Sequence, residues 1–480
     1  MNLRLDARIL GFLVGSLGAF QLLPVAVALL YGESPLPYLT SALVAGACGL
    51  ALALPARPRH HLLRARDAYL VVAAGWAIGS AFGALPYVLS GALGPVDAFF
   101  ESVAGFTTTG STVLVQIEGS PRGLLLWRSF TQWIGGMGII LFTVAILPLL
   151  GIGGMQLFRA EVPGPVKDKL SPRVVETARR LWVIYVGLTA AEWLALWLAG
   201  MGHFDAVCHA LTTLATGGFS TRDASVGAFG SPAVEWIVIV FMTAAGMNFV
   251  LHHRLAIEGP RSLWRDAELR YYLAVIAVAT LACWPFAAHQ AGTGTAAEGL
   301  RGTAFSVVSV VTTTGYGSVD FERWPPLCQL VLLQLMILGG MSGSTAGGVK
   351  SLRVLLGFRA LAAAVQKLVH PRAVRPVKYG GRTVPDDVVA GIWAFFTAYF
   401  AIAAAATAVV AATGYDLVTA VSAALTTLGN VGPGLGAVGP YDNFSHFPGA
   451  VKLVLSACMI AGRLEVFTLL VLLQPSFWRR

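Results

Sequence analysis

Four short stretches of this chain combine threonine with glycine: FTTTGST at 106–112, LATGGFS at 214–220, TTTGYGS at 312–318 and TTLGNVG at 426–432. Each stands at the end of a short apolar segment, and the stretches recur roughly a hundred residues apart, a spacing that indicates an internal repeat. Backbone carbonyls can hold a bare cation, and glycine relaxes the φ limits that would stop successive carbonyls from pointing the same way. Four such turns in one chain predict one complete cation filter.

The third stretch carries the most specific pattern. It contains Thr-x-Gly-Tyr-Gly, close to the TVGYG loop whose carbonyls replace the water around K⁺ in potassium channels. A single Thr-Thr-Gly turn is equally consistent with a helix C-cap whose small residues allow close packing. The recurrence of the turn at matching places in four similar units favours the filter.

The composition is that of a helical membrane protein. Of 480 residues, 56% are hydrophobic and only 12% are charged, whereas soluble domains carry about 25% charged residues. Lysine and arginine cluster in every second connection, so the positive-inside rule predicts cytoplasmic termini and an even number of spans. This placement argues against nucleic-acid binding, and the five cysteines form no CxxC pair. The basic blocks are 4–8, 57–66, 159–180, 254–270, 350–382 and 479–480.

The order of apolar segments predicts the elements that carry the turns. An N-terminal two-helix segment (1–60) precedes four units at 68–150, 175–257, 268–360 and 385–475. Each unit reads as a long helix, a half-helix, a turn and a second long helix, the last being 232–252 in the second unit and 446–474 in the fourth. The half-helices are too short to cross a bilayer, which needs ~20 residues, so we expect them to enter and return on the outer side. The fold class is all-α polytopic, with about ten transmembrane helices.

The function classes follow from the same pattern. The C-terminal ends of four half-helices around one axis favour a cation. The alternative is a secondary transporter of another cation or solute, Na⁺- or H⁺-coupled and built from broken helices, but such folds usually show two inverted repeats. The sequence contains no HExxH, GxSxG or Walker-type motif, so we do not expect an enzyme.

Longer motifs make the chain similar to a known family. FFESVAGFTTTGST (99–112), QWIGGMGIILFTVAILPLLGIGGMQLFRAE (132–161), GGFSTRDASVG (217–227), GGMSGSTAGGVKSLR (339–353), LVHPRAV (368–374) and GRLEVFTLLVLL (462–473) resemble the Trk/Ktr/HKT superfamily, most closely the Trk-type bacterial potassium uptake proteins. The resemblance implies four M1-P-M2 repeats around one K⁺ pore, a homodimer in the lipid of the bacterial inner membrane, and no organic cofactor. It also implies separate cytosolic nucleotide-binding regulatory subunits of the RCK/KTN type, for which the basic loops at 159–180 and 350–382 are candidate docking surfaces.

The resemblance also implies which residues form the filter. The strongest positions are the glycines, the pairs before them offer the inner carbonyls, and the residues after them line the outer filter. A serine in place of the first glycine goes with sodium preference in plant relatives. In chain order the filter residues are Thr108, Thr109, Gly110, Ser111, Ala215, Thr216, Gly217, Gly218, Thr313, Thr314, Gly315, Tyr316, Thr427, Leu428, Gly429 and Asn430.

Two further features lie after the third and fourth turns. The segment LGGMSGSTAGGVKS (338–351) interrupts a spanning helix with five glycines, and each glycine costs a helix ~1 kcal/mol against alanine. The segment is consistent with tight helix packing through small residues. The alternative is a flexible loop, and the family resemblance implies that this loop is the gate. Arg463 lies within the last span, where a charge is costly; the resemblance places it beneath the filter, and the alternative is a buried packing pair. The gate residues are Gly339, Gly340, Gly343, Ser344, Thr345, Gly347, Gly348 and Lys350.

Overall fold

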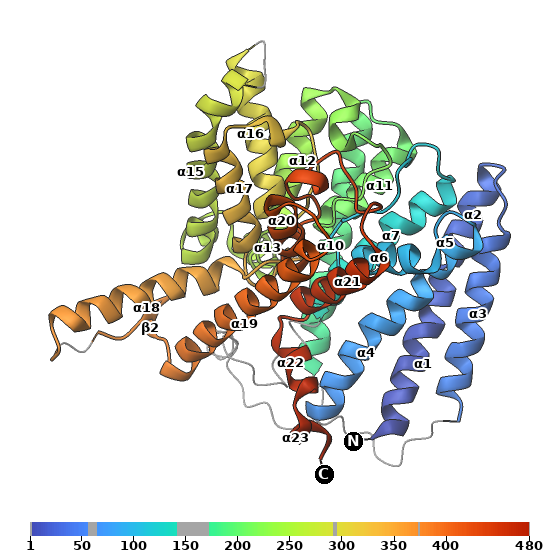
Figure 1. The fold of residues 1–480 in the computed structure, drawn as a ribbon, viewed down its shortest axis with the longest axis horizontal. Helices are drawn as coiled ribbons and strands as arrows, with labels where there is room; N and C mark the ends of the chain where they lie inside the picture. The colour runs from blue at the N-terminus through green and yellow to red at the C-terminus, as the bar shows by residue number, and fades with distance from the viewer. Residues whose placement is uncertain (1, 56–64, 142–171, 291–294, 373–374, 480) are drawn as a thin grey trace.

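The computed structural model describes residues 2–55, 65–141, 172–290, 295–372 and 375–479. Within these ranges the chain is helical, apart from one hairpin of two short strands, β1 (Lys378–Tyr379) and β2 (Arg382–Thr383). Gly380 and Gly381 form its two-residue turn with φ of 55° and 81°, the conformation that a tight hairpin requires. Both termini lie at the same end of the molecule (Figure 1).

The N-terminal segment packs through small residues. It comprises α1 (Leu3–Phe20), α2 (Leu22–Leu30) and α3 (Leu36–Ala53). A Cβ added at Gly11 would lie 2.7 Å from the backbone nitrogen of Ala53, and one added at Gly18 would lie 2.8 Å from the carbonyl oxygen of Ala42. Glycines therefore let the backbones of α1 and α3 approach closely, which is a common way for helices to associate in membranes.

Four units of similar build follow, and they surround the centre of the molecule in Figure 1. Each has a long first helix, a half-helix of 12 to 16 residues and a third helix. The first helices are α4 (Ala65–Gly83, followed by α5, Leu85–Leu89), α10 (Pro172–Leu198), α15 (Ala267–Gln290) and α19 (Asp386–Ala411). The half-helices are α6 (Pro95–Phe106), α11 (His203–Leu214), α16 (Ala296–Val311) and α20 (Leu417–Gly429). The third helices are α7 (Arg122–Leu141), α12 (Pro232–Ala245), α17 (Pro326–Leu338) and α21 (Gly449–Arg463).

Three of the third helices are broken, which corrects the single long helices predicted over 232–252 and 446–474. The chain bends by 97° between α12 and α13 (Phe249–Glu258) and by 115° between α21 and α22 (Phe467–Leu473). Asn248 caps α13 by accepting from the Val250 amide, while Glu465 and Val466 have left-handed φ of 55° and 56°. The third break is the loop after α17, which ends where α18 (Ser351–Val369) begins.

The remaining helical segments are short: α14 (Arg261–Trp264), α23 (Pro475–Trp478), η2 (Ser225–Phe229), η3 (Phe321–Arg323) and η4 (Gly436–Val438). In the described part of the chain, six helices are long and apolar enough to cross a membrane, and eight if each bent pair forms one span. α18 projects away from the body of the molecule (Figure 1).

Candidate ion filter

The four threonine–glycine turns share one backbone conformation. Each follows the C-terminal end of a half-helix and has two left-handed residues separated by one other residue. In three of the turns the first of these residues is a threonine, which adopts positive φ only at a cost, so the conformation is imposed by the surrounding structure. The left-handed pairs are Thr108 and Gly110 (52° and 81°), Thr216 and Gly218 (52° and 75°), Thr313 and Gly315 (58° and 78°), and Asn430 and Gly432 (55° and 107°).

The second left-handed residue of each turn is a glycine, and this glycine touches the next turn. A Cβ on Gly110 would clash with the carbonyl oxygen of Gly217, and one on Gly218 with that of Thr314. The same holds for Gly315 against Val431, and for Gly432 against Thr109, 2.7 Å away, which closes the circle. In each pair the carbonyl belongs to the residue just before the next glycine. The four turns therefore meet in a closed ring with fourfold regularity, in which only glycine fits at four positions.

One cavity opens directly against this ring. It is lined by all four glycines, Gly110, Gly218, Gly315 and Gly432, together with Ser111, Asp223 and Asp442. Two carboxylates and the backbone of the ring glycines thus line one hollow, which Arg128 also lines. The arrangement is suited to strip water from a cation and hold it with carbonyl oxygens.

The structure shifts the register expected for two turns. The equivalents of Gly110 and Gly315 are Gly218 and Gly432, one and three residues beyond the predicted Gly217 and Gly429. In the fourth unit, Thr427, Leu428 and Gly429 still belong to α20, and Ala215 caps α11 in the second. The sequence does not show which glycine belongs to the ring, because Gly217 and Gly218 are adjacent and α20 continues past its threonines. The φ angles and the contacts between turns identify the ring glycines.

The glycine-rich loop lies against the ring. Thr313 Oγ1 accepts from the Gly347 amide at 2.6 Å, and the carbonyl of Gly429 accepts from the Gly348 amide at 2.9 Å. Gly339, Gly343, Gly348 and Lys350 all have φ between 71° and 77°. The loop therefore has irregular backbone and contacts residues that precede the ring glycines and do not line the cavity.

Arg463 joins this loop to another unit. Its guanidinium is 2% exposed and donates to the carbonyl of Thr345 at 2.7 Å and to that of Gly135 in α7 at 3.1 Å. No carboxylate pairs with it among the described residues; Glu465, two residues on, pairs with Arg353 of α18. A buried guanidinium thus links the loop to the first unit.

Comparison with known proteins agrees with this architecture. A family model described as a cation transport protein, TrkH, matches residues 42–480. The chain is 42% identical to the Trk system potassium uptake protein TrkH of Vibrio parahaemolyticus and 43% identical to that of Escherichia coli, in both cases over the whole of either chain. The crystal structure of the potassium transporter TrkH from Vibrio parahaemolyticus superposes with a TM-score of 0.92 at 39% identity, covering all of both chains.

The chain belongs to the TrkH family of cation transport proteins. The all-α polytopic fold and the family expected from the sequence are confirmed, and the protein is a multi-pass membrane transporter. Part of the 132–161 motif and most of the basic block 159–180 lie outside the described residues.

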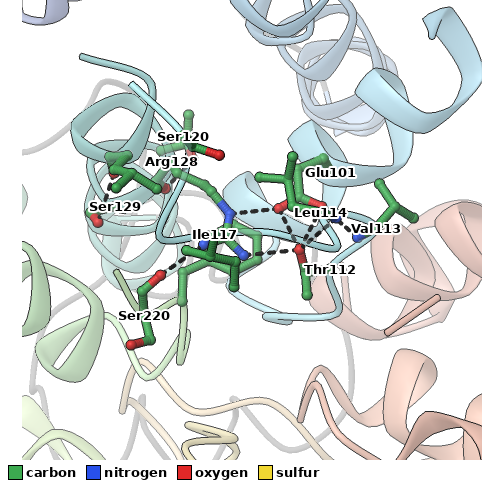
Figure 2. A network of polar contacts seen from close by, with 12 residues as sticks. Glu101, Thr112, Val113, Leu114, Ile117, Ser120, Arg128, Ser129 and Ser220 are labelled. Atoms are coloured by element: carbon green, nitrogen blue, oxygen red, sulfur yellow. Dashed lines mark hydrogen bonds and ion pairs between the residues drawn. The ribbon is translucent and has the colours of Figure 1, made fainter. Parts of the chain in front are cut away.

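A buried ion pair, which the motifs did not reveal, braces the first two turns of the ring in this TrkH-family chain (Figure 2). Arg128 Nε of α7 lies 2.6 Å from Glu101 Oε1 of α6, and the two side chains are 2% and 0% exposed. Glu101 also accepts from the Thr112 hydroxyl and from the Val113 amide, just after the first turn. Arg128 reaches the carbonyl of Ser220 after the second turn, at 2.9 Å. One pair therefore ties together the chain segments that leave two neighbouring turns.

Polar side chains also hold the second, third and fourth turns. Gln132 donates to the Gly217 carbonyl at 2.6 Å and accepts from the Phe219 amide, and Asn430 donates to the hydroxyl of Thr109 in the first turn. The hydroxyl of Tyr316 lies 2.5 Å from that of Thr212 in α11. The Tyr316 side chain thus points back into the protein and braces the third turn. Spacing alone could not identify these partners because they lie on other units.

Proposed function

We propose that this protein takes up potassium ions through one pore in each chain. The closed ring of Gly110, Gly218, Gly315 and Gly432 carries the proposal, because each glycine admits a carbonyl of the neighbouring turn and all four line one cavity. Carbonyls at such a ring can replace the hydration shell of a cation. The names of the Trk-system relatives supply the ion, K⁺, as the transported species.

The loop from Gly339 to Lys350 is the proposed gate below this filter. Two of its backbone amides donate to Thr313 and Gly429, two and three residues before the ring glycines Gly315 and Gly432, which supports the proposal. Arg463 is proposed to shorten the time that a cation spends at the gate. The loop holds the guanidinium near the ion path through the Thr345 carbonyl, and the positive charge of the guanidinium repels the cation. The Lys350 side-chain nitrogen donates to the Ala346 carbonyl within the same loop.

The assembly is proposed on the same basis. We expect a homodimer in the bacterial inner membrane with cytoplasmic termini, regulated by cytosolic nucleotide-binding subunits. The α18–α19 face supports a second copy: Phe358, Leu361, Trp393 and Phe400 line one apolar groove there and are 45–63% exposed. Cross-linking through cysteines placed on this face of the purified protein would test the dimer.

A matched pair of glycine substitutions tests the filter. A Cβ on Gly315 would clash with the Val431 carbonyl, whereas one on Gly317, two residues later, meets its neighbours at ordinary contact distances of 3.4 Å or more. We expect Gly315→Ala to abolish most Rb⁺ uptake into proteoliposomes or to lower its preference over Na⁺, while Gly317→Ala behaves like the wild type. Equal behaviour of two well-folded variants would contradict the filter assignment.

Flux under imposed gradients separates a channel from a symporter. Proteoliposomes with a fixed K⁺ gradient would be given a pH gradient, a Na⁺ gradient or neither. A channel predicts Rb⁺ uptake that follows the K⁺ potential alone. Uptake driven uphill by the second ion would instead favour the symporter.

A further inference from the structure

One carboxylate holds both ends of the glycine-rich loop. Glu268 is the second residue of α15 and is 3% exposed. Its Oε1 accepts from the backbone amide of Ser342 at 2.7 Å, near the start of the loop, and from the hydroxyl of Ser351 at 2.8 Å, at the first residue of α18. Two residues nine positions apart are therefore fastened to a single oxygen.

The loop depends on such outside partners. It has no regular hydrogen-bond ladder of its own, and left-handed φ at Lys350 is unfavourable for a residue with a side chain. The Ser351 amide donates to the Gly340 carbonyl at 2.9 Å, which draws the same two ends together. One buried carboxyl oxygen accepts from residues near both ends of the loop, so the Glu268 contacts are well placed to set the shape of the whole segment.

The connection to α18 makes this contact a point of control. α18 projects from the body of the molecule (Figure 1), and Ser351 is its first residue. A displacement of α18 away from α15 would stretch the hydrogen bond between Ser351 and Glu268. Because the same oxygen holds Ser342, a shift of the carboxylate with Ser351 also loosens the other end of the loop.

We propose that Glu268 is a positioning residue that latches the loop in its blocking conformation and releases it when α18 moves. This inference rests on the proposed gate and deepens it, since it names the group by which a displacement of α18 would reach the pore. It predicts that loss of the carboxylate opens the path and leaves the filter unchanged.

The test uses the full-length protein in proteoliposomes. We expect Glu268→Ala to raise basal Rb⁺ flux several-fold with the same preference for Rb⁺ over Na⁺, and Ser351→Ala, which removes one of the two bonds, to raise it less. The matched control is Glu235→Ala: Glu235 is also buried and pairs with Arg301 at 2.8 Å, but it touches no loop residue. It should leave basal flux unchanged.

A second readout follows the loop itself. Ser344, at 1% exposure, would be replaced by cysteine, and its labelling by a polar thiol reagent would be timed in detergent-solubilised protein. The parent chain without this cysteine corrects for the five native ones. Faster labelling in the Glu268→Ala background is expected. If Glu268→Ala fails to fold, Ser351→Ala decides by the same two measurements.

The outcomes separate the latch from the gate. Wild-type flux and labelling in the folded Glu268 or Ser351 variant would overturn the latch. A loop shortened within 343–348 tests the gate independently: raised flux in that variant with no effect of Glu268→Ala would leave the gate and reject the latch. Unchanged flux in the shortened loop would reject both.

Discussion

The Glu101–Arg128 pair offers a quantitative test of how the filter is braced. Both side chains are buried, and the carboxylate accepts from Arg128, Thr112 and Val113. Glu101→Gln keeps the size of the side chain but leaves the Arg128 charge without a partner. Breaking a buried pair in this way costs about 3–5 kcal/mol of folding free energy. We expect a loss of that size, measured by chemical denaturation in detergent.

The double variant makes the reasoning sharper. Arg128→Gln alone leaves the Glu101 charge unpaired, and Glu101→Gln with Arg128→Gln removes both charges. The double variant should therefore be destabilised by less than the sum of the single variants, with a coupling of about 0.5–3 kcal/mol. Arg180→Gln is the control: its pair with Glu176 is more than half exposed, so the free energy should change by about 0.5 kcal/mol or less.

The same variants should change ion preference. Arg128 reaches the Ser220 carbonyl and Glu101 reaches the Val113 amide, so the pair links the first turn to the second. Each single variant should therefore lower the ratio of Rb⁺ to Na⁺ uptake in proteoliposomes. The bracing role would be refuted if the single variants were as stable as Arg180→Gln. It would also be refuted if the losses of unfolding free energy were additive in the double variant and ion selectivity stayed at the wild-type value.

Two other predictions concern the ionisable residues Arg463 and Glu322. Arg463→Gln should raise flux several-fold, because a unit charge at 4 Å is worth about 4 kcal/mol at an effective dielectric constant near 20 and part of that repulsion is removed; low yield and reduced flux would instead indicate a packing role. In the η3 segment, outside the spanning helices, burial and the neighbouring Asp442 and Asp320 raise the pKa of Glu322 to about 7. The folded state thus favours the protonated carboxyl, and stability should fall as pH rises from about 4.5 through 7. Glu322→Gln should raise the melting temperature at pH 8 and leave it nearly unchanged at pH 5, and an equal shift at both pH values would count against this assignment.

Local patterns made much of the fold predictable. The half-helices ending in Thr-Gly turns could be recognised because a segment of 12 to 16 apolar residues is too short to span a bilayer. Gly110 and Gly315 stood out because each follows three consecutive threonines at the end of such a segment. The glycine-rich loop was visible as a composition that helices avoid.

The partners of these elements were not visible in the chain. Gln132, Arg128 and Glu268 are single polar residues in apolar or mixed segments, and each acts on a turn or loop far away in sequence. The 115° bend arises at Glu465 and Val466, which have positive φ, and the 97° bend arises just before Asn248, which caps α13; neither is marked by a helix-breaking pattern in the sequence.

The sequence by itself determined the class of protein, the four repeats and the turns that carry carbonyls, because hydropathy, length and glycine content act locally. Only the tertiary structure decided which glycines form the ring. Gly217 and Gly218 are equivalent as letters, and Gly429 looks like a better match than Gly432. The choice depends on which residue has a neighbouring carbonyl where its Cβ would stand. That is a contact between units about a hundred residues apart, set by how four repeats close around one axis.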